Sequence, residues 1–204
     1  MATIEFVTIE VADTTAADGF YTAAFGLGPR VRVRTAEAST TGFRGFTLSL
    51  VVSQPANANS LLDSALDAGA TSLKPAAKSL WGYGGVVQAP DGTICTVASS
   101  AKKDSGPVTR QIDAFVLQLG VADVAASKRF YLDRGFAVAK SYGRRYVELG
   151  TPSSPVKLAL YPRRTLAKVA GVSADGAGSH RLTIGSDAGP FTDPDGFVWE
   201  PESP

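Results

Sequence analysis

An internal repeat in this 204-residue chain constrains its fold more than any other feature. Residues 7–21 read VTIEVADTTAADGFY and residues 117–131 read LQLGVADVAASKRFY, so Val-Ala-Asp and Phe-Tyr recur at the same spacing. A second pair, APDGTICT at 89–96 and DPDGFVWE at 193–200, closes each half. A repeat of this length indicates two copies of one structural unit. Two such copies face each other across a shared surface, and a site is expected at that surface.

Each half is predicted to open with a strand that runs into a helix. Alternating apolar residues predict strands over 4–11 and 115–121, and Asp13 and Asp123 are suited to cap the helices that follow, which end near residues 25 and 134. Further strands are predicted at 30–35, 43–53, 71–75, 84–89, 93–98, 136–142, 145–150, 156–161, 180–185 and 197–200. Further helices are predicted at 57–68 and 163–170, and a Gly-rich loop at 171–179.

The domain organisation follows from the repeat and from one polar segment. Residues 101–110 read AKKDSGPVTR, and the Gly-Pro pair within this stretch is typical of a linker. The sequence therefore predicts one unit over 1–100, a linker over 101–110 and a second unit over 111–204.

The charge and cysteine content exclude several classes of function. A formal net charge of +1 gives no field that would attract nucleic acid or an anionic membrane, and Arg30, Arg32 and Arg34 are expected to face solvent. Cys95 is the single cysteine, so an intramolecular disulfide and a Cys-rich zinc site are excluded. The amino terminus lacks a signal-peptide pattern, and no apolar stretch reaches membrane-spanning length. We expect a cytoplasmic protein.

Four motifs together resemble the vicinal oxygen chelate superfamily, which includes glyoxalase I, extradiol dioxygenases and the fosfomycin- and bleomycin-resistance proteins. They are the strand–Val-Ala-Asp–helix–Phe-Tyr opening, LALYPR at 158–163, WGYGG at 81–85 and the Pro-Asp-Gly–strand ending. The resemblance covers about residues 4–99 and 112–201. It implies an α+β fold in which βαβββ modules pair and curl mixed sheets around a cavity. It does not by itself imply an enzyme, because the family mixes metal-dependent catalysts with metal-free binders.

The resemblance also implies where metal ligands would lie, on the cavity face of the first and last strand of each module. Most of the corresponding positions hold residues that do not bind a metal: Phe6, Phe46, Val116 and Thr96. His180 and Glu200 remain as candidate ligands, and Gln118, Glu10 and Glu148 are the residues that would complete a set. One histidine cannot form a site of two histidines and a carboxylate within one chain. A divalent metal is thus a candidate cofactor, but the incomplete ligand set favours none.

Several other side chains are candidates to bind a ligand. Trp81 and Tyr83 lie in a Gly-rich stretch from which aromatic rings can project into a cavity. The other aromatic candidates are Tyr161, Tyr146 and Tyr142. The remaining candidates are an apolar lining of Phe6, Phe46, Leu48, Leu50, Leu182 and Ile184, with His180, Glu200 and Gln118 to orient the ligand. Trp199 and Cys95 are expected in the core instead.

The sequence supports two main functions and leaves the choice between them open. The favoured one is a metal-independent protein of the sequestration or resistance type, which binds a small, partly aromatic or apolar molecule in an aromatic-lined cavity. The alternative is a divalent-metal-dependent lyase, isomerase or dioxygenase of the glyoxalase type that uses His180 and Glu200. A scaffold with a filled cavity is a third reading. Two fused units fit a monomer, whereas an edge strand at 30–34 would allow a homodimer.

Overall fold

The structure is a computed structural model that describes residues 1–151 and 153–201. Its helices are α1 (Thr14–Phe25), the short 3-10 helix η1 (Gly28–Arg30), α2 (Pro55–Asp67), α3 (Val124–Leu132) and α4 (Arg163–Ala170). The strands of the first half are β1 (Ile4–Val11), β2 (Val31–Thr35), β3 (Thr40–Gly42), β4 (Phe46–Val51), β5 (Thr71–Ser79), β6 (Gly82–Gln88) and β7 (Ile94–Ser99). Those of the second half are β8 (Ala114–Val121), β9 (Val138–Ser141), β10 (Val147–Leu149), β11 (Lys157–Pro162), β12 (Gly176–Gly178), β13 (Leu182–Ser186), β14 (Phe191–Thr192) and β15 (Val198–Pro201).

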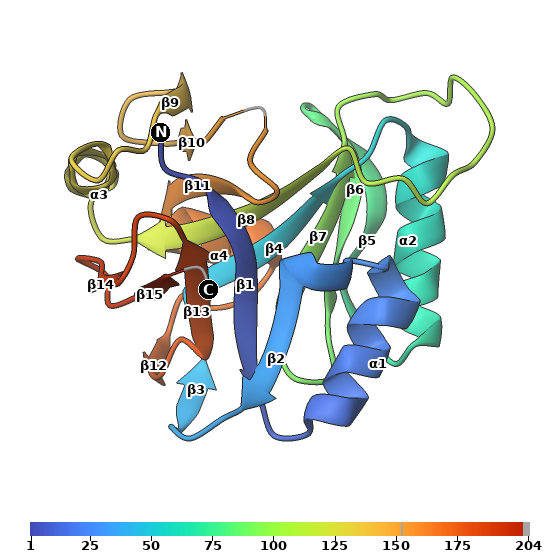
Figure 1. Ribbon diagram of the computed structural model, residues 1–204. Helices are drawn as coiled ribbons and strands as arrows, with labels where there is room; N and C mark the ends of the chain where they lie inside the picture. The colour runs from blue at the N-terminus through green and yellow to red at the C-terminus, as the bar shows by residue number, and fades with distance from the viewer. Residues whose placement is uncertain (152, 202–204) are drawn as a thin grey trace.

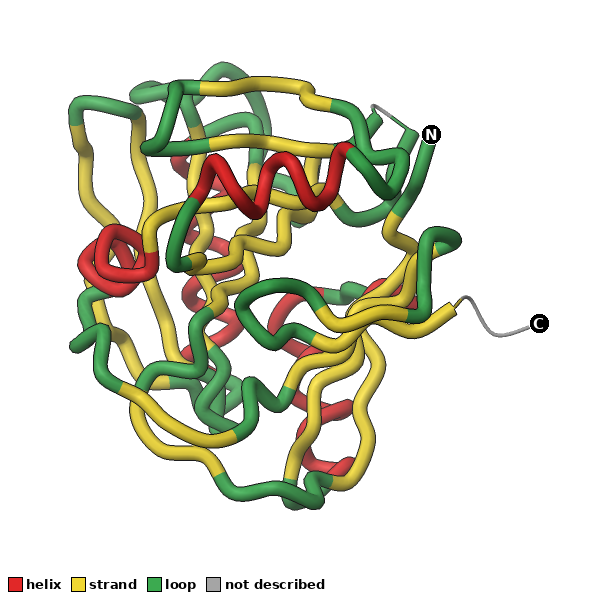
Figure 2. Tube along the Cα trace, turned by 90° about the vertical axis from the view of Figure 1, so that its left-hand side faces the viewer, coloured by secondary structure: helices red, strands yellow, loops and turns green. Residues whose placement is uncertain are grey.

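Most strands belong to two mixed sheets, and each sheet takes strands from both halves of the chain (Figure 1). The five-stranded sheet has the order β14-β15-β13-β1-β2, and the eight-stranded sheet has the order β5-β6-β7-β4-β8-β11-β10-β9. Strands β1 and β15, which carry the two ends of the described chain, lie on the same side of the molecule (Figure 2). The predicted α+β fold with curled mixed sheets is confirmed.

The two sheets differ in how complete their modules are. In the eight-stranded sheet, β4-α2-β5-β6-β7 and β8-α3-β9-β10-β11 are both full βαβββ modules, joined by the antiparallel pairing of β4 with β8. The five-stranded sheet joins two shortened modules, β1-α1-β2 and β13-β14-β15, through the antiparallel pairing of β1 with β13. The full modules therefore build one sheet and the reduced modules build the other.

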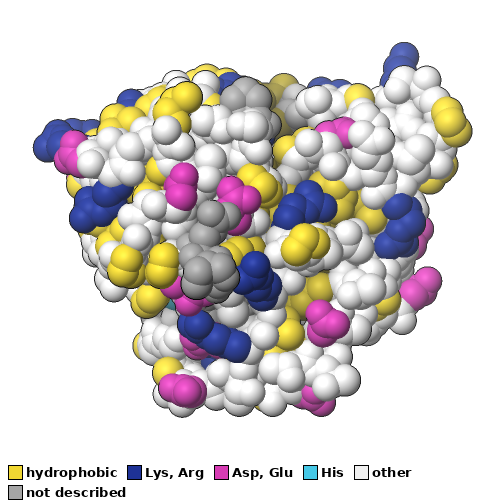
Figure 3. Space-filling model, in the orientation of Figure 1, with side chains coloured by type: hydrophobic (Ala, Val, Ile, Leu, Met, Phe, Trp, Pro, Cys, Tyr) yellow, Lys and Arg dark blue, Asp and Glu magenta, His cyan; other side chains and the backbone are white. Residues whose placement is uncertain are grey.

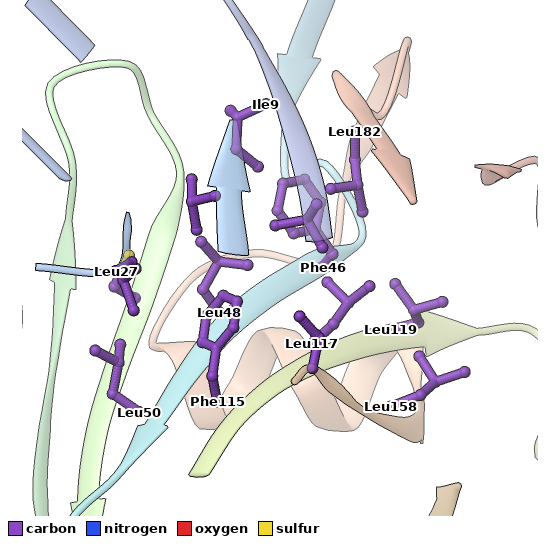
Figure 4. Close-up of a cluster of buried hydrophobic side chains, with 14 of the residues drawn as sticks. Ile9, Leu27, Phe46, Leu48, Leu50, Phe115, Leu117, Leu119, Leu158 and Leu182 are labelled. Atoms are coloured by element: carbon purple, nitrogen blue, oxygen red, sulfur yellow. The ribbon is translucent and has the colours of Figure 1, made fainter. Parts of the chain in front are cut away.

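The hydrophobic core lies between the sheets (Figure 4). Ile9 and Leu182 from the five-stranded sheet point towards Phe46, Leu48 and Leu117 of the eight-stranded sheet, and all are nearly inaccessible to solvent. The expectation of an apolar cavity lining was therefore wrong for these core residues: Leu48, Leu50, Leu182 and Ile184. An alternating strand pattern shows which face is apolar, but not whether a ligand or a second sheet covers that face.

In each half the repeated tyrosine of the first helix contacts the turn that closes that half, but through different positions, because Asp91 lies within Pro-Asp-Gly and Asp193 precedes it. In the first half the hydroxyl of Tyr21 donates to Asp91 at 2.7 Å, and in the second half the hydroxyl of Tyr131 donates to the buried Asp193. Each helix is also capped as predicted, because the side chain of the preceding Asp accepts backbone N–H groups of the first turn.

The segment predicted as a Gly-rich loop at 171–179 contains a strand instead. Gly176–Gly178 pairs antiparallel with Thr40–Gly42, and this two-stranded ribbon, β12 with β3, ties the second half to the first. The approach is so close that a Cβ at Gly176 would lie 2.2 Å from the carbonyl oxygen of Phe43. Glycine is needed here because the two backbones approach too closely for a side chain. The prediction had interpreted these glycines as loop residues instead.

The surface around β1 and β2 carries charges of both signs (Figure 3). In the face shown in Figure 3, which carries β1 and β2, Lys/Arg and Asp/Glu side chains are interspersed.

No helix in the described part of the chain combines the length and the apolar character that a bilayer crossing requires.

Candidate functional site

On the five-stranded sheet, the face turned away from the core carries two carboxylates that share one guanidinium group. Glu10 of β1 accepts from Arg34 of β2 at 2.9 Å, and Glu200 of β15 accepts from the same guanidinium at 3.2 Å. Arg34 also donates to the hydroxyl of Thr183 on β13. A side-chain cation thus links β1 and β15, which are the first and the last strand of this sheet in chain order.

His180 lies outside the extended part of β13. Arg181 has a φ of 51°, so the chain turns there and the strand begins only at Leu182. The ring nitrogens of His180 lie 2.6 Å from the carbonyl oxygen of Arg44 and 3.0 Å from that of Asp195. The ring stacks on Phe197 with centroids 3.9 Å apart. Both ring nitrogens are therefore directed at backbone oxygens.

These contacts do not fit the predicted metal centre. His180 and Glu200 have separate partners, because the first contacts backbone carbonyls and the second binds Arg34. Within residues 1–151 and 153–201, no three His, Cys, Asp or Glu side chains are grouped so as to hold a metal ion. A divalent ion at Glu10 and Glu200 would have to displace a bound guanidinium, which already neutralises part of their charge.

The eight-stranded sheet carries a different polar group on its outer face, the face turned away from the core. The register places Thr47, Gln118, Ala159 and Glu148 opposite one another across β4, β8, β11 and β10. Residues directly opposite in a sheet share a face. Their neighbours along each strand point to the core and are fully buried: Leu48, Leu117, Leu119, Leu158, Leu160, Val147 and Leu149.

Tyrosine side chains adjoin this row, and we call Gln118, Tyr142, Tyr146, Glu148 and Tyr161 the tyrosine cluster. The rings of Tyr146 and Tyr161 meet edge to face with centroids 5.0 Å apart, and those of Tyr142 and Tyr146 are 6.0 Å apart. Tyr146 donates to Glu148 at 2.7 Å, while Gln118 accepts from Thr47 at 2.8 Å. The sequence had identified the aromatic members and Gln118, and the structure brings them together.

The tyrosine cluster is partly shielded from water and holds one carboxylate. The side chain of Glu148 is 22% exposed, and its counter-ion Lys157 is 4.0 Å away. Burial, the hydrogen bond to Glu148 and the charge of that carboxylate raise the pKa of Tyr146 well above its usual range. Burial and the same carboxylate also raise the pKa of Tyr161. Both phenols are therefore neutral at physiological pH, and each presents a ring and a hydroxyl.

The other predicted ligand-binding residues lie elsewhere. Trp81 is 85% exposed at the turn between β5 and β6, and Tyr83, which lies in strand β6 rather than in a loop, donates to Asn59. Phe6 is buried on the outer face of the five-stranded sheet beneath Arg32, whose guanidinium carbon is 3.4 Å from the ring centroid. Phe46 lies in the core and borders a surface groove.

Solved structures provide the comparison with known proteins. Glyoxalase I from Zea mays matches with a TM-score of 0.62 at 15% identity, over 98% of this chain and 91% of that chain. The chain has the glyoxalase fold. A putative dioxygenase from Bacillus subtilis shares that fold with a TM-score of 0.54 at 11% identity, over 90% of this chain and 69% of its own. These neighbours are consistent with the predicted vicinal oxygen chelate fold.

At the level of sequence, no protein-family model and no curated protein matches the chain. Identities of 15% and 11% support the fold and carry no site residue from one protein to another. The function must therefore be argued from the side chains of this glyoxalase-fold protein.

Proposed function

We propose that this protein binds a small, partly aromatic organic molecule at the tyrosine cluster, without a metal ion. The observation that carries the proposal is the meeting of Tyr146, Tyr161, Gln118 and Glu148 on one partly exposed face of the sheet built from full modules. Aromatic rings supply contact area, and the amide and carboxylate fix the orientation of a ligand.

The charge of the cluster favours a ligand that combines an aromatic ring with an amine. Tyrosine faces attract a cation, and Glu148 accepts hydrogen bonds from an ammonium group. Lys140 already lies 5.2 Å from the ring centroid of Tyr142, so one ring of the cluster already faces an ammonium group. A role of the sequestration or resistance type, in which the ligand is held and not converted, fits a site of this kind.

The metal-dependent alternative is supported less well. It requires His180 and Glu200 as ligands, and each has another partner: backbone carbonyl oxygens for His180 and Arg34 for Glu200. The groups of the tyrosine cluster are one carboxylate, one amide and neutral phenols, a set better suited to hydrogen bonds than to a divalent ion.

Ligand-observed NMR with two matched probes tests the proposal. Tyramine carries a phenol ring and an amine, and 4-hydroxyphenylacetate carries the same ring and a carboxylate. We expect EDTA-treated protein to bind tyramine more tightly than the acid, and both Tyr146→Ala and Glu148→Gln to weaken that binding about tenfold. Trp81→Ala is the matched control, because it removes an exposed aromatic side chain outside the cluster. Binding of tyramine that is equal in all variants contradicts the proposal.

A further inference from the structure

A surface groove of about 330 Å³, whose lining includes no residue of the tyrosine cluster, lies where three segments meet. These segments are the ribbon of β3 and β12 with the residues that follow β3, the turn between β6 and β7, and the chain after α4. The lining consists of Gly42, Phe43, Arg44, Phe46, Gln88, Gly92, Thr93, Ile94, Val172, Ser173 and Asp175. Its volume is at the lower end of the range for small-molecule sites.

Arg44 in the wall of this groove is a half-buried cation that forms no ion pair with any residue of 1–151 or 153–201. Its guanidinium donates to Thr93 Oγ1 at 3.4 Å and to the backbone carbonyl of Asp91. No carboxylate oxygen lies within 4.0 Å of it among the described residues. Burial lowers the pKa of Arg44, and the charge of Arg181 lowers it further against the opposing effect of Asp91. A cation in this position is stabilised by a bound anion.

Two more arginines add positive charge around the groove. Arg163 donates to the carbonyl oxygens of Phe43 and Ala174, and its guanidinium carbon lies 5.1 Å from the ring centroid of Phe43. Arg181, the neighbour that lowers the pKa of Arg44, has a buried Nε without a hydrogen-bond partner in the described structure. The backbone carbonyls that hold Arg163 satisfy hydrogen bonds but supply no net negative charge.

The nearby carboxylates are already engaged. Asp91 accepts from the hydroxyl of Tyr21 and from the N–H of Thr93, each at 2.7 Å. Asp175 at the rim accepts from Ser173 Oγ at 2.9 Å. Three arginines thus lie in or near the groove wall, and neither Asp91 nor Asp175 forms an ion pair with them in the part of the chain that the structure describes.

We propose that this groove binds a small organic anion, a carboxylate or a phosphate with an apolar body. Arg44 lies in the wall to pair with the anionic group, and Gln88 and Ser173 offer further polar contacts. Phe43, Ile94 and Val172 form the apolar part of the lining. The lining shares no residue with the tyrosine cluster, and the two sites are tested with different probes, so either proposal can fail alone.

Protein-observed NMR titration with three probes tests this site and separates the two anion classes. Benzoate and phenyl phosphate share one ring and differ in the anionic group, and benzylamine is the cationic control. We expect at least one anion to shift the amide signals of Gln88, Thr93 and Ser173, and benzylamine to leave them unchanged. The anion that binds with the higher affinity, benzoate or phenyl phosphate, identifies the ligand class as a carboxylate or a phosphate.

Variants then connect the binding to Arg44. Arg44→Gln is expected to weaken the anion about tenfold, whereas Arg164→Gln, which removes an exposed arginine outside the lining, leaves affinity unchanged. Because Arg44 also holds the β6–β7 turn, Ser173→Trp provides a second test that fills the groove from an exposed position. The proposal is overturned if neither anion shifts the amide signals of the groove residues, or if benzylamine shifts them as much as the anions do. It is also overturned if the Ser173→Trp variant binds the anion with the affinity of the wild type.

Discussion

Arg34 donates to Glu200 at 3.2 Å, although the two residues are 166 positions apart in the chain. The same guanidinium donates to Glu10 at 2.9 Å, so it joins the strand that opens the first half to the strand that closes the second. The resemblance to metal-dependent relatives placed potential ligands on these strands. In this chain one arginine pairs with both carboxylates and neutralises part of their charge.

Removal of this arginine should expose the two carboxylates to cations. We predict that Arg34→Ala binds Mn²⁺ measurably, as followed by loss of the free Mn²⁺ signal in EPR, while wild type and the charge-matched control Arg164→Ala do not. The free energy of unfolding should fall by no more than about 1 kcal/mol, because the Arg34 side chain is 44% exposed. Equal uptake of Mn²⁺ by wild type and Arg34→Ala would contradict the role assigned to Arg34.

The two tyrosines of the repeat should contribute unequally to stability. Tyr131→Phe leaves the buried Asp193 without its hydroxyl donor and is expected to cost about 1–3 kcal/mol. Tyr21→Phe should cost about 1 kcal/mol, since its acceptor Asp91 is only partly buried. Urea denaturation measures both, with Tyr83→Phe as a control for loss of a more exposed hydroxyl. A larger loss for Tyr21→Phe than for Tyr131→Phe would refute this ranking.

Asp193 should give the protein a specific dependence on pH. Burial raises the pKa of Asp193 above its usual range, against the opposing effects of the Tyr131 hydroxyl and of the backbone N–H groups of Phe197 and Asp195. The folded state therefore binds more protons than the unfolded state between the unfolded pKa of about 3.9 and the raised folded value. Stability from this group decreases as pH rises through that window.

Asp193→Asn tests this dependence because the amide does not titrate. The free energy of unfolding of wild type minus that of the variant, measured in urea from about pH 3 to 7, should decrease with rising pH. An increase over the same range would mean that the folded protein favours the charged carboxylate.

Cys95 should be unreactive in the folded protein. The thiol is fully buried, and burial, with the nearby Asp91, raises its pKa far above the usual range. Little thiolate is then available to attack a reagent. We expect iodoacetamide to label Cys95 in urea but not under native conditions, as read by mass spectrometry. Rapid native labelling would show that this part of the core opens readily.

Local patterns predicted the elements of this fold well, because they depend on residues close in sequence. Asp13 and Asp123 cap their helices, and Trp199 and Cys95 lie in the core as expected. The arginines of β2 were expected to be only solvent-facing, yet Arg32 covers Phe6 and Arg34 binds two carboxylates. Those contacts depend on strand pairings that span most of the chain, which periodicity does not reveal.

The candidate site could be predicted only in part, because it too depends on the pairing of strands that are far apart in the sequence. Gln118, Tyr146 and Tyr161 could be named as candidates from the sequence, but the register that places Gln118 and Glu148 in one row involves three strands. The predicted role of His180 assumed an extended strand through Arg181, and the positive φ of that residue turns His180 towards backbone carbonyls. A non-glycine residue in this conformation has no clear sequence signal.

The central claim is that an organic ligand binds at the tyrosine cluster and needs no metal. The most direct test is a protein-observed NMR titration of EDTA-treated protein with tyramine, repeated after addition of Mg²⁺ and then Zn²⁺. The account predicts shifts centred on the amide signals of Gln118, Tyr146 and Tyr161, with the same affinity in each condition. Binding that requires a divalent ion, or shifts centred on His180 and Glu200, would contradict the account.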